Sequence, residues 1–162
     1  MLLLLVRHAQ AAEQSATEYP DDSVRPLVPK GKKAQARISK ELRRRKLIPD
    51  KVFSSPWKRA WQTARILVEE TGLPKSARVA SEALAAAPDL ARIAEAVGDV
   101  AADATIALVG HEPWMGELAS LLLTGRSDAV HVDYPKSGVM GIEVEAINGE
   151  SGSGALRFFL TP

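Results

Sequence analysis

Two arginines and two histidines of this chain stand at or soon after the ends of short apolar runs. They are Arg7 and His8 after residues 2–6, Arg59 one turn into the helix predicted to follow residues 51–53, and His111 after residues 105–109. Arginine presents a planar fork that matches two oxygens of a phosphoryl group. Histidine is a nucleophile when neutral and a hydrogen-bond donor when protonated. Together these residue types suit phosphate binding and the transfer of a phosphoryl group through a histidine.

Metal-assisted chemistry has less support in the sequence. The chain has three histidines, no cysteine and no suitably spaced metal-ligand partners, and it carries neither an Asp pair nor a phosphate-cradling glycine-rich sequence. The lack of cysteine also excludes disulfides, thiolate catalysis and cysteine zinc sites. We therefore predict a reaction without metal or other cofactor.

The elements that must position these side chains follow from hydrophobic patterning. Short apolar runs alternate with segments of helical period, which predicts an α/β fold: a three-layer arrangement with a mostly parallel central sheet flanked by helices. The predicted strands are 2–6, 51–53, 77–80 and 105–109, and the predicted helices are 31–46, one from Ser55-Pro56 to Glu70, and two that open at Pro88 and Pro113. Ligands of open α/β sheets bind beyond the carboxyl ends of the strands, where the four side chains are expected to meet.

The C-terminal part of the chain has a different pattern. Residues 138–147 and 155–160 have the character of strands, and the loop between them, 148–154, is rich in glycine and serine. This pattern predicts a hairpin-like pair, and so an antiparallel edge to the sheet.

Length and charge limit the class of protein. The 162 residues, of 17.4 kDa, fit one domain spanning 1–162, with 46% hydrophobic and 25% charged residues as in globular proteins. The net charge of +1 provides no global attraction to nucleic acid or a membrane, so neither is expected as a partner. The apolar start at residues 2–6 is too short for a secretion signal or a membrane span, which favours a cytoplasmic location. The oligomeric state is left open.

Three ordered segments of the chain resemble the signature motifs of the histidine phosphatase superfamily. They are 5–9, which resembles its Arg-His-Gly motif, 54–64, which resembles its S-x-x-x-R-A-x-Q-T-A signature, and 110–113, which matches its third motif. The small size and the sequence of residues 22–27 are similar to the SixA-type phosphohistidine phosphatases. The resemblance covers nearly the whole chain, weakens after Leu123, and implies a phosphoglycerate mutase-like fold.

The resemblance also implies roles for individual residues. His8 would attack phosphorus and carry the phosphoryl group, which water would release in a second step. Arg7, Arg59 and His111 would hold the non-bridging oxygens. Attack requires a neutral nitrogen, so a hydrogen bond from the other ring nitrogen to a backbone carbonyl is expected to fix the tautomer. Glu82 matches the carboxylate that protonates leaving groups elsewhere in the superfamily.

Several features have two interpretations at this point. Ala9 replaces the usual glycine, which implies either a slightly different backbone or a tighter pocket floor. Glu82 is either the acid or a surface residue. Arg25, in the long loop 11–30, either contacts phosphate or substrate or stabilises a turn. The basic segment 30–46 is either a solvated helix face or a docking patch for an acidic partner or nucleic acid.

The predicted function is that of a cofactor-independent phosphatase with a covalent phosphohistidine intermediate, acting on phosphohistidine in a protein. A departing imidazole needs little help from an acid, whereas an alkoxide needs much more. In larger relatives a helical insertion covers the site, whereas few residues separate Glu82 from Pro88 in this chain. The site is therefore expected to be open. Trp57, beside the site, is expected to face a substrate protein. The alternatives are a phosphomonoesterase for a small or nucleotide-like phosphate, and a non-catalytic phosphoprotein-binding module.

Overall fold

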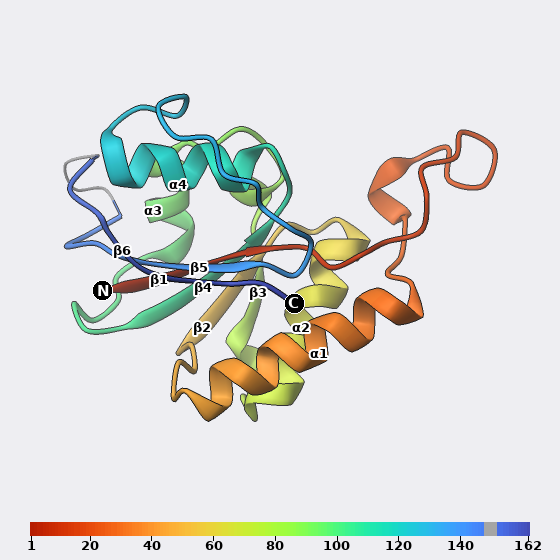
Figure 1. Cartoon of the computed structure of the whole chain (residues 1–162), viewed down its shortest axis with the longest axis horizontal. Coiled ribbons are helices and arrows are strands. Elements are labelled where there is room, and N and C mark those ends of the chain that lie inside the picture. The colour runs from red at the N-terminus through yellow and green to blue at the C-terminus, as the bar shows by residue number, and fades with distance from the viewer. Residues whose placement is uncertain (148–151) are drawn as a thin grey trace.

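A computed structural model describes residues 1–147 and 152–162 of the chain, and it shows one mixed sheet between two layers of helices (Figure 1). The strands are β1 (Leu2–Arg7), β2 (Lys51–Ser54), β3 (Arg78–Ala80), β4 (Thr105–Gly110), β5 (Val139–Glu143) and β6 (Ala155–Leu160). The helices are α1 (Pro29–Arg44), α2 (Lys58–Thr71), α3 (Leu90–Val97) and α4 (Trp114–Thr124), with short 3₁₀ turns at Asp22–Val24, Lys75–Ala77 and Glu82–Leu84.

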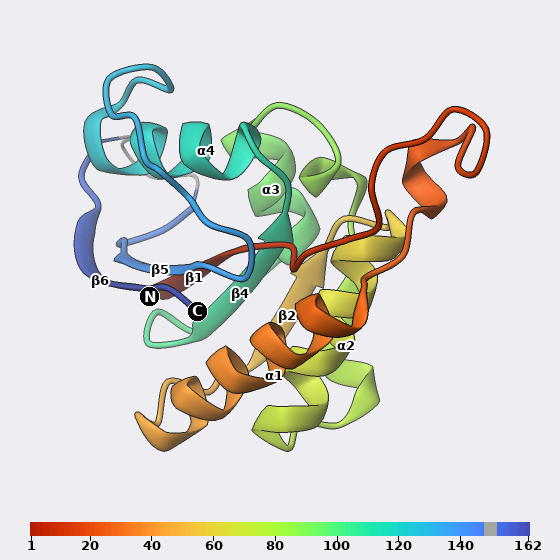
Figure 2. The same ribbon diagram turned by 45° about the vertical axis from the view of Figure 1, so that its right-hand side comes forward.

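The strand order is β3-β2-β4-β1-β5-β6. The first four strands in this order run parallel, whereas β5 is antiparallel to both β1 and β6. Helices α3 and α4 cover one face of the sheet and α1 and α2 cover the other (Figure 2). The predicted three-layer architecture, mostly parallel with an antiparallel C-terminal edge, is confirmed.

The central strand β1 is apolar throughout because both of its faces are covered. Successive side chains of a strand point to opposite faces. Leu3 and Leu5 therefore join the cluster under α3 and α4, and Leu4 and Val6 join the cluster under α1 and α2. This double burial holds the end of β1, and the residues after it, in a rigid frame.

Several helices begin at other residues than the sequence predicted. Helix α1 begins at Pro29, two residues early, and α2 begins at Lys58, after the Ser55-Pro56 pair that was predicted to open it. The helix predicted from Pro88 begins at Leu90, since the Asp89 side chain accepts hydrogen bonds from two backbone N–H groups of its first turn.

The first of the two C-terminal strands differs from the prediction at both ends, and it begins at Val139, one residue late. Strand β5 ends at Glu143, four residues before the predicted Ile147, whereas β6 has the predicted bounds. Residues 148–151 of the predicted connection lie outside the described residues. None of the helices in the described part combines the length and the apolar character that a bilayer crossing requires.

The basic segment predicted at 30–46 forms the outward face of α1. Its lysines and arginines are exposed, and near its end Arg44 and Arg45 both pair with Glu41. Such exposed pairs contribute little stability. The choice between a solvated face and a docking patch stays open.

A long loop leaves the carboxyl end of β1 and returns to α1, projecting from the body of the molecule (red to orange in Figure 1). Its two arms are joined by the bridge between Ala11 and Leu27 and by the hydrogen bond from Val28 N to Gln10 O, of 3.1 Å. Helix α1 approaches the loop closely, because a Cβ added to Gly31 would lie 2.1 Å from Gln10 O. Glycine at this position lets the helix start directly against the segment that follows His8.

We expect Gly31→Ala to lower the free energy of unfolding by about 1–3 kcal/mol, since the added methyl group forces backbone apart. Alanine in an ordinary helix position instead stabilises by up to about 1 kcal/mol relative to glycine. Urea denaturation followed by circular dichroism measures the change. The control is Gly116→Ala in α4, where the new Cβ would meet only the Glu112 side chain, at 3.1 Å, so its loss is expected to be smaller. Equal or greater stability of Gly31→Ala would contradict the close approach.

Candidate active site

The two predicted histidines come together at the carboxyl ends of adjacent parallel strands. β1 pairs with β4 so that Arg7 lies opposite Gly110, which places His8 beside His111, with ring centroids 5.1 Å apart. Arg59, in the first turn of α2, is buried and points its Nε to within 3.3 Å of His8 Nε2. Three of the four predicted side chains are therefore in one cluster.

Arg7, the fourth, is held beside this cluster by the segment that leads into β5. Its Nη1 donates a hydrogen bond to Tyr134 O, and Ser137 N lies 3.2 Å from Arg7 O and 3.3 Å from His8 O. The hydroxyl of Tyr134 donates to Leu5 O, which ties the same segment to β1. The four residues that the sequence brought forward are thus gathered at one rim of the sheet.

His8 is fixed as a neutral imidazole. Its Nδ1 lies 2.7 Å from Ala9 O, and since a carbonyl only accepts, Nδ1 carries the proton and Nε2 the free lone pair. Burial lowers the pKa of His8 to about 3, with further lowering by the nearby His111, Arg59 and Arg7. The predicted hydrogen bond from the ring to a backbone carbonyl is confirmed.

His111 is oriented by Ser55, the serine of the signature in 54–64, to which the sequence analysis assigned no role in the site. Its Nε2 lies 2.9 Å from Ser55 Oγ, and the same hydroxyl accepts from Trp57 N at 3.3 Å. Burial lowers the pKa of His111 to about 3, and the charge of Arg59 adds to the effect. Both histidines are consequently uncharged at neutral pH in this state of the site.

Within the described residues, four buried side-chain atoms have no hydrogen-bond partner, and two of them, Arg7 Nε and His111 Nδ1, belong to this cluster. A buried donor without a partner costs about 1–3 kcal/mol. A tetrahedral oxyanion supplies acceptors on several sides at once, which suits a group of arginine donors that converge on one place. The polar groups of the site therefore match a phosphoryl group better than an apolar ligand.

Asp22, in the 3₁₀ turn of the long loop, is a site residue that the sequence analysis missed. Its carboxylate lies 2.9 Å from Arg59 Nη2 and 2.8 Å from Arg25 Nε, and its carbonyl accepts from Arg59 Nη1 at 2.7 Å. Hydrogen bonding from Arg25 first, and the charge of Arg59, hold the pKa of Asp22 below its usual value. The only available signal was an acidic residue inside the segment 22–27.

Arg25 is engaged in the way that its turn-stabilising interpretation predicts. Besides its pair with Asp22, it donates from Nη1 to Ala12 O at 2.7 Å, which ties the two arms of the loop together. Its charge nevertheless contributes to lowering the pKa of His111, so it lies near the site.

Lys136 is a further cation that no motif indicated. It precedes Ser137, and burial together with repulsion from Arg7, Arg25 and Arg59 lowers its pKa. Because the segment 134–138 approaches the site only through the fold, the sequence around Lys136 carried no sign of its position.

Glu82 is not brought into this cluster. It is exposed at the start of the 3₁₀ turn after β3, and no hydrogen bond or ion pair joins it to a site residue in the described part of the chain. A second carboxylate, Glu112, lies next to His111 but accepts a hydrogen bond from Gly116 N at 2.9 Å. Burial raises the pKa of Glu112, and its hydrogen bond places it at the first turn of α4.

A remaining expectation concerns Ala9, which stands where the family usually has glycine. The methyl group of Ala9 packs in a small apolar cluster with Leu27 and Ile66, and its N–H donates to Thr63 Oγ1 at 3.0 Å. The extra carbon is thus absorbed between the loop and α2. His131, the third histidine of the chain, is exposed and belongs to none of the three motifs.

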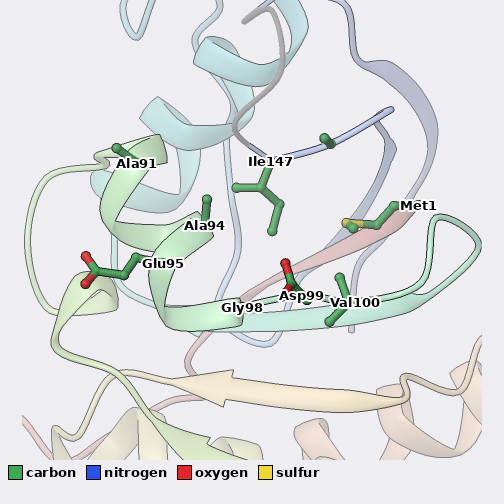
Figure 3. A pocket seen from close by; sticks show the side chains of 9 residues that line it. Met1, Ala91, Ala94, Glu95, Gly98, Asp99, Val100 and Ile147 are labelled. Carbon is green, nitrogen blue, oxygen red and sulfur yellow. The ribbon is translucent and has the colours of Figure 1, made fainter.

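A separate hollow lies at the other end of the sheet, near the start of β1 (Figure 3). Met1, Val100 and Ile147 give it an apolar side, and Glu95 and Asp99 add carboxylates. It contains no histidine or arginine, so it does not offer the groups that phosphate chemistry needs. Among the described residues, no three His, Asp or Glu side chains gather in a way that would hold a metal ion.

Comparison with known proteins agrees with this geometry. Residues 3–81 match the model of the histidine phosphatase superfamily (branch 1), a stretch that includes Arg7, His8 and Arg59. The chain is 29% identical to an uncharacterised protein of Picosynechococcus, over 99% of this chain and 96% of that protein. It is 26% identical to the phosphohistidine phosphatase SixA of Escherichia coli, over 100% of this chain and 94% of that protein.

A structure of the protein histidine phosphatase SixA complexed with tungstate has the same fold. The TM-score is 0.78 at 24% identity, over 99% of this chain and 97% of that chain. The chain accordingly has the phosphoglycerate mutase-like fold of that structure, as the motifs implied.

The two buried neutral histidines make stability depend on pH. Their pKa of about 3 in the folded state lies below the unfolded value of about 6.5, so between these pH values the unfolded chain binds more protons. We expect the free energy of unfolding to fall as pH is lowered from 6.5, by up to about 1.4 kcal/mol per pH unit for each histidine.

Urea titrations between pH 7 and pH 4 in buffer without phosphate measure this slope. His111→Asn is expected to reduce the slope by about one proton, whereas His131→Asn, which alters an exposed histidine, leaves it unchanged. Parallel slopes for the wild type and His111→Asn would show that His111 is not buried in neutral form.

Proposed function

We propose that the chain is a phosphatase of the histidine phosphatase superfamily, whose model matches residues 3–81, and that it hydrolyses phosphohistidine in a protein through a phosphoryl group carried on His8. The observation that carries this proposal is the state of His8. Its Nδ1 proton is committed to Ala9 O, and its Nε2 lone pair faces Arg59 within a group of phosphate-binding side chains.

The first step forms a bond between His8 Nε2 and phosphorus while the bond from phosphorus to the leaving nitrogen breaks. Arg7, Arg59 and His111 hold the non-bridging oxygens. Arg59 Nε–H keeps its proton and changes its hydrogen-bond acceptor from His8 Nε2 to a phosphoryl oxygen. Such transition states depend mostly on positioning and charge stabilisation, which fixed arginines supply. The leaving imidazole takes its proton from water, and the hydroxide that remains is neutralised by the proton that the attacking water releases in the second step.

In the second step water attacks phosphorus, the bond to His8 Nε2 breaks and inorganic phosphate leaves. Asp22 remains ionised beside Arg59 and is available to orient this water and accept its proton. Lys136 and Arg25 add positive charge where the dianion enters. We assign these three residues supporting roles in the reaction.

Three observations favour phosphohistidine over a phosphate ester. A relative that matches the chain over its whole length is a phosphohistidine phosphatase. Glu82, the carboxylate expected to protonate a leaving group, is exposed and forms no hydrogen bond or ion pair with a site residue among the described residues, and imidazole is a leaving group that does not depend on such an acid. The short connection from Glu82 to α3 leaves no roof of the kind that encloses a small metabolite.

A phosphomonoesterase acting on a small or nucleotide-like phosphate is the alternative enzyme, and a phosphoprotein-binding module without turnover is the alternative outside catalysis. The neutral nucleophile favours turnover over binding alone, because binding of a dianion would be served better by a charged imidazolium. A cytoplasmic setting remains part of the proposal.

We expect a protein carrying ³²P-phosphohistidine to label the enzyme during turnover, with an acid-labile and base-stable bond. His8→Ala is expected to abolish both label and turnover, whereas His131→Ala, which removes an exposed histidine outside the site, retains both. Rapid quenching followed by gel autoradiography measures the label. Turnover that persists in His8→Ala would overturn the mechanism.

Glu82→Gln separates the two enzyme proposals. Turnover of phosphohistidine is expected to change less than about threefold, since no acid is required, whereas any turnover of an alkyl phosphate would fall by about 100-fold or more if Glu82 is its acid. Initial rates of phosphate release on the two substrates provide the comparison. A wild type that prefers the alkyl phosphate, and loses that activity in Glu82→Gln, would favour the phosphomonoesterase.

A further inference from the structure

Two tryptophans from different elements pack on His111. Trp57 immediately precedes α2 and Trp114 is the first residue of α4, so each follows the end of a central strand. Their ring centroids lie 4.8 and 6.1 Å from that of His111, and 6.4 Å from each other in an edge-to-face arrangement. The three rings form one continuous aromatic cluster.

The apolar core does not explain this placement. Neither tryptophan belongs to any of the three apolar clusters of the described residues, and both are half-buried, whereas His111 beside them is 3% exposed. Large aromatic rings that are left partly open to solvent next to a reactive group are typical of binding surfaces.

The two tryptophans lie beyond the phosphate-binding side chains, as seen from His8. His8 contacts His111 and Arg59, and Trp57 in turn contacts both, lying 4.8 Å from His111 and 4.7 Å from the Arg59 guanidinium carbon. The tryptophans therefore lie one layer further from the nucleophile than the side chains that hold the phosphoryl oxygens. In an in-line displacement the leaving group departs on the side away from the nucleophile.

We propose that Trp57 and Trp114 form an aromatic wall that receives a flat aromatic leaving group, and so select phosphorylated imidazole or aryl groups over aliphatic ones. The inference rests on the proposed phosphatase function and names the chemistry of the departing group. An imidazole ring can pack on indole in the offset or edge-to-face way of His111 itself, and protonation of the departing ring adds a cation–π attraction.

The test compares leaving groups that differ in aromatic character. The quantity is the ratio of kcat/KM for phosphoimidazole to that for phosphoramidate, with phenyl phosphate against ethyl phosphate as the ester pair. In Trp57→Leu and Trp114→Leu both ratios are expected to fall about three- to tenfold, whereas Trp57→Phe and Trp114→Phe keep most of the preference. Because each variant's ratio is compared with the wild-type ratio for the same two substrates, the difference in their intrinsic reactivity cancels.

Trp61→Leu is the matched control. Trp61 lies one turn along α2 from Trp57 and its ring stacks under the Arg78 guanidinium, 3.9 Å from the ring centroid, away from the site. Both ratios are expected to be unchanged in this variant. If Trp57→Leu and Trp114→Leu slow aromatic and aliphatic substrates equally, the tryptophans only support His111 and Arg59, and the proposal is wrong.

Failure of this inference is distinguishable from failure of the proposed function. An enzyme that forms the labelled His8 intermediate but shows unchanged ratios lacks the aromatic wall and retains the mechanism. Calorimetric dissociation constants for phenyl and ethyl phosphate, measured in His8→Asn, give the same comparison without turnover. Equal affinities for the two esters in His8→Asn, unchanged by the tryptophan substitutions, would also overturn the proposal.

Discussion

The parallel pairing of β1 with β4 is the constraint on which the site depends. Its register sets Arg7 against Gly110, so the two chains leave the sheet side by side and deliver His8 and His111 to one place. A shift by a single residue would turn every apolar side chain of β1 to the opposite face. Both faces of β1 are buried, so only one register packs its side chains correctly. That same register brings the two imidazoles together.

Charge is distributed unevenly over this junction. Arg7, Arg25, Arg59 and Lys136 surround two imidazoles that burial keeps neutral, and Asp22 is the carboxylate that pairs with two of the arginines. Burial, and after it repulsion from the three arginines, lowers the pKa of Lys136, and a dianionic phosphoryl group would relieve that repulsion. The net charge of the chain, +1, gave no indication of this local excess.

Much of the fold was predictable because its signals are local. Short apolar runs between segments of helical period identified the strands. The reactive residues were predictable because they stand directly at strand ends or in the first turn of a helix. Ser55, Asp22 and Lys136 were not identified as site residues, because their contacts join segments far apart in the chain and depend on how the loops fold. Glu82 was predicted from its match to a position in the family, and it is exposed without a hydrogen bond or ion pair to the site among the described residues, because its place after a strand does not fix the direction of its side chain.

The many contacts of Arg59 have a thermodynamic consequence. Its guanidinium packs on the face of Trp57, donates to His8 Nε2, and forms an ion pair with Asp22. Freezing a free arginine side chain costs about 2 kcal/mol of rotamer entropy. In this protein the Arg59 side chain is already ordered in the folded state, so anion binding does not lose that entropy again. Binding only exchanges acceptors of the guanidinium, such as His8 Nε2, for oxygens of the anion.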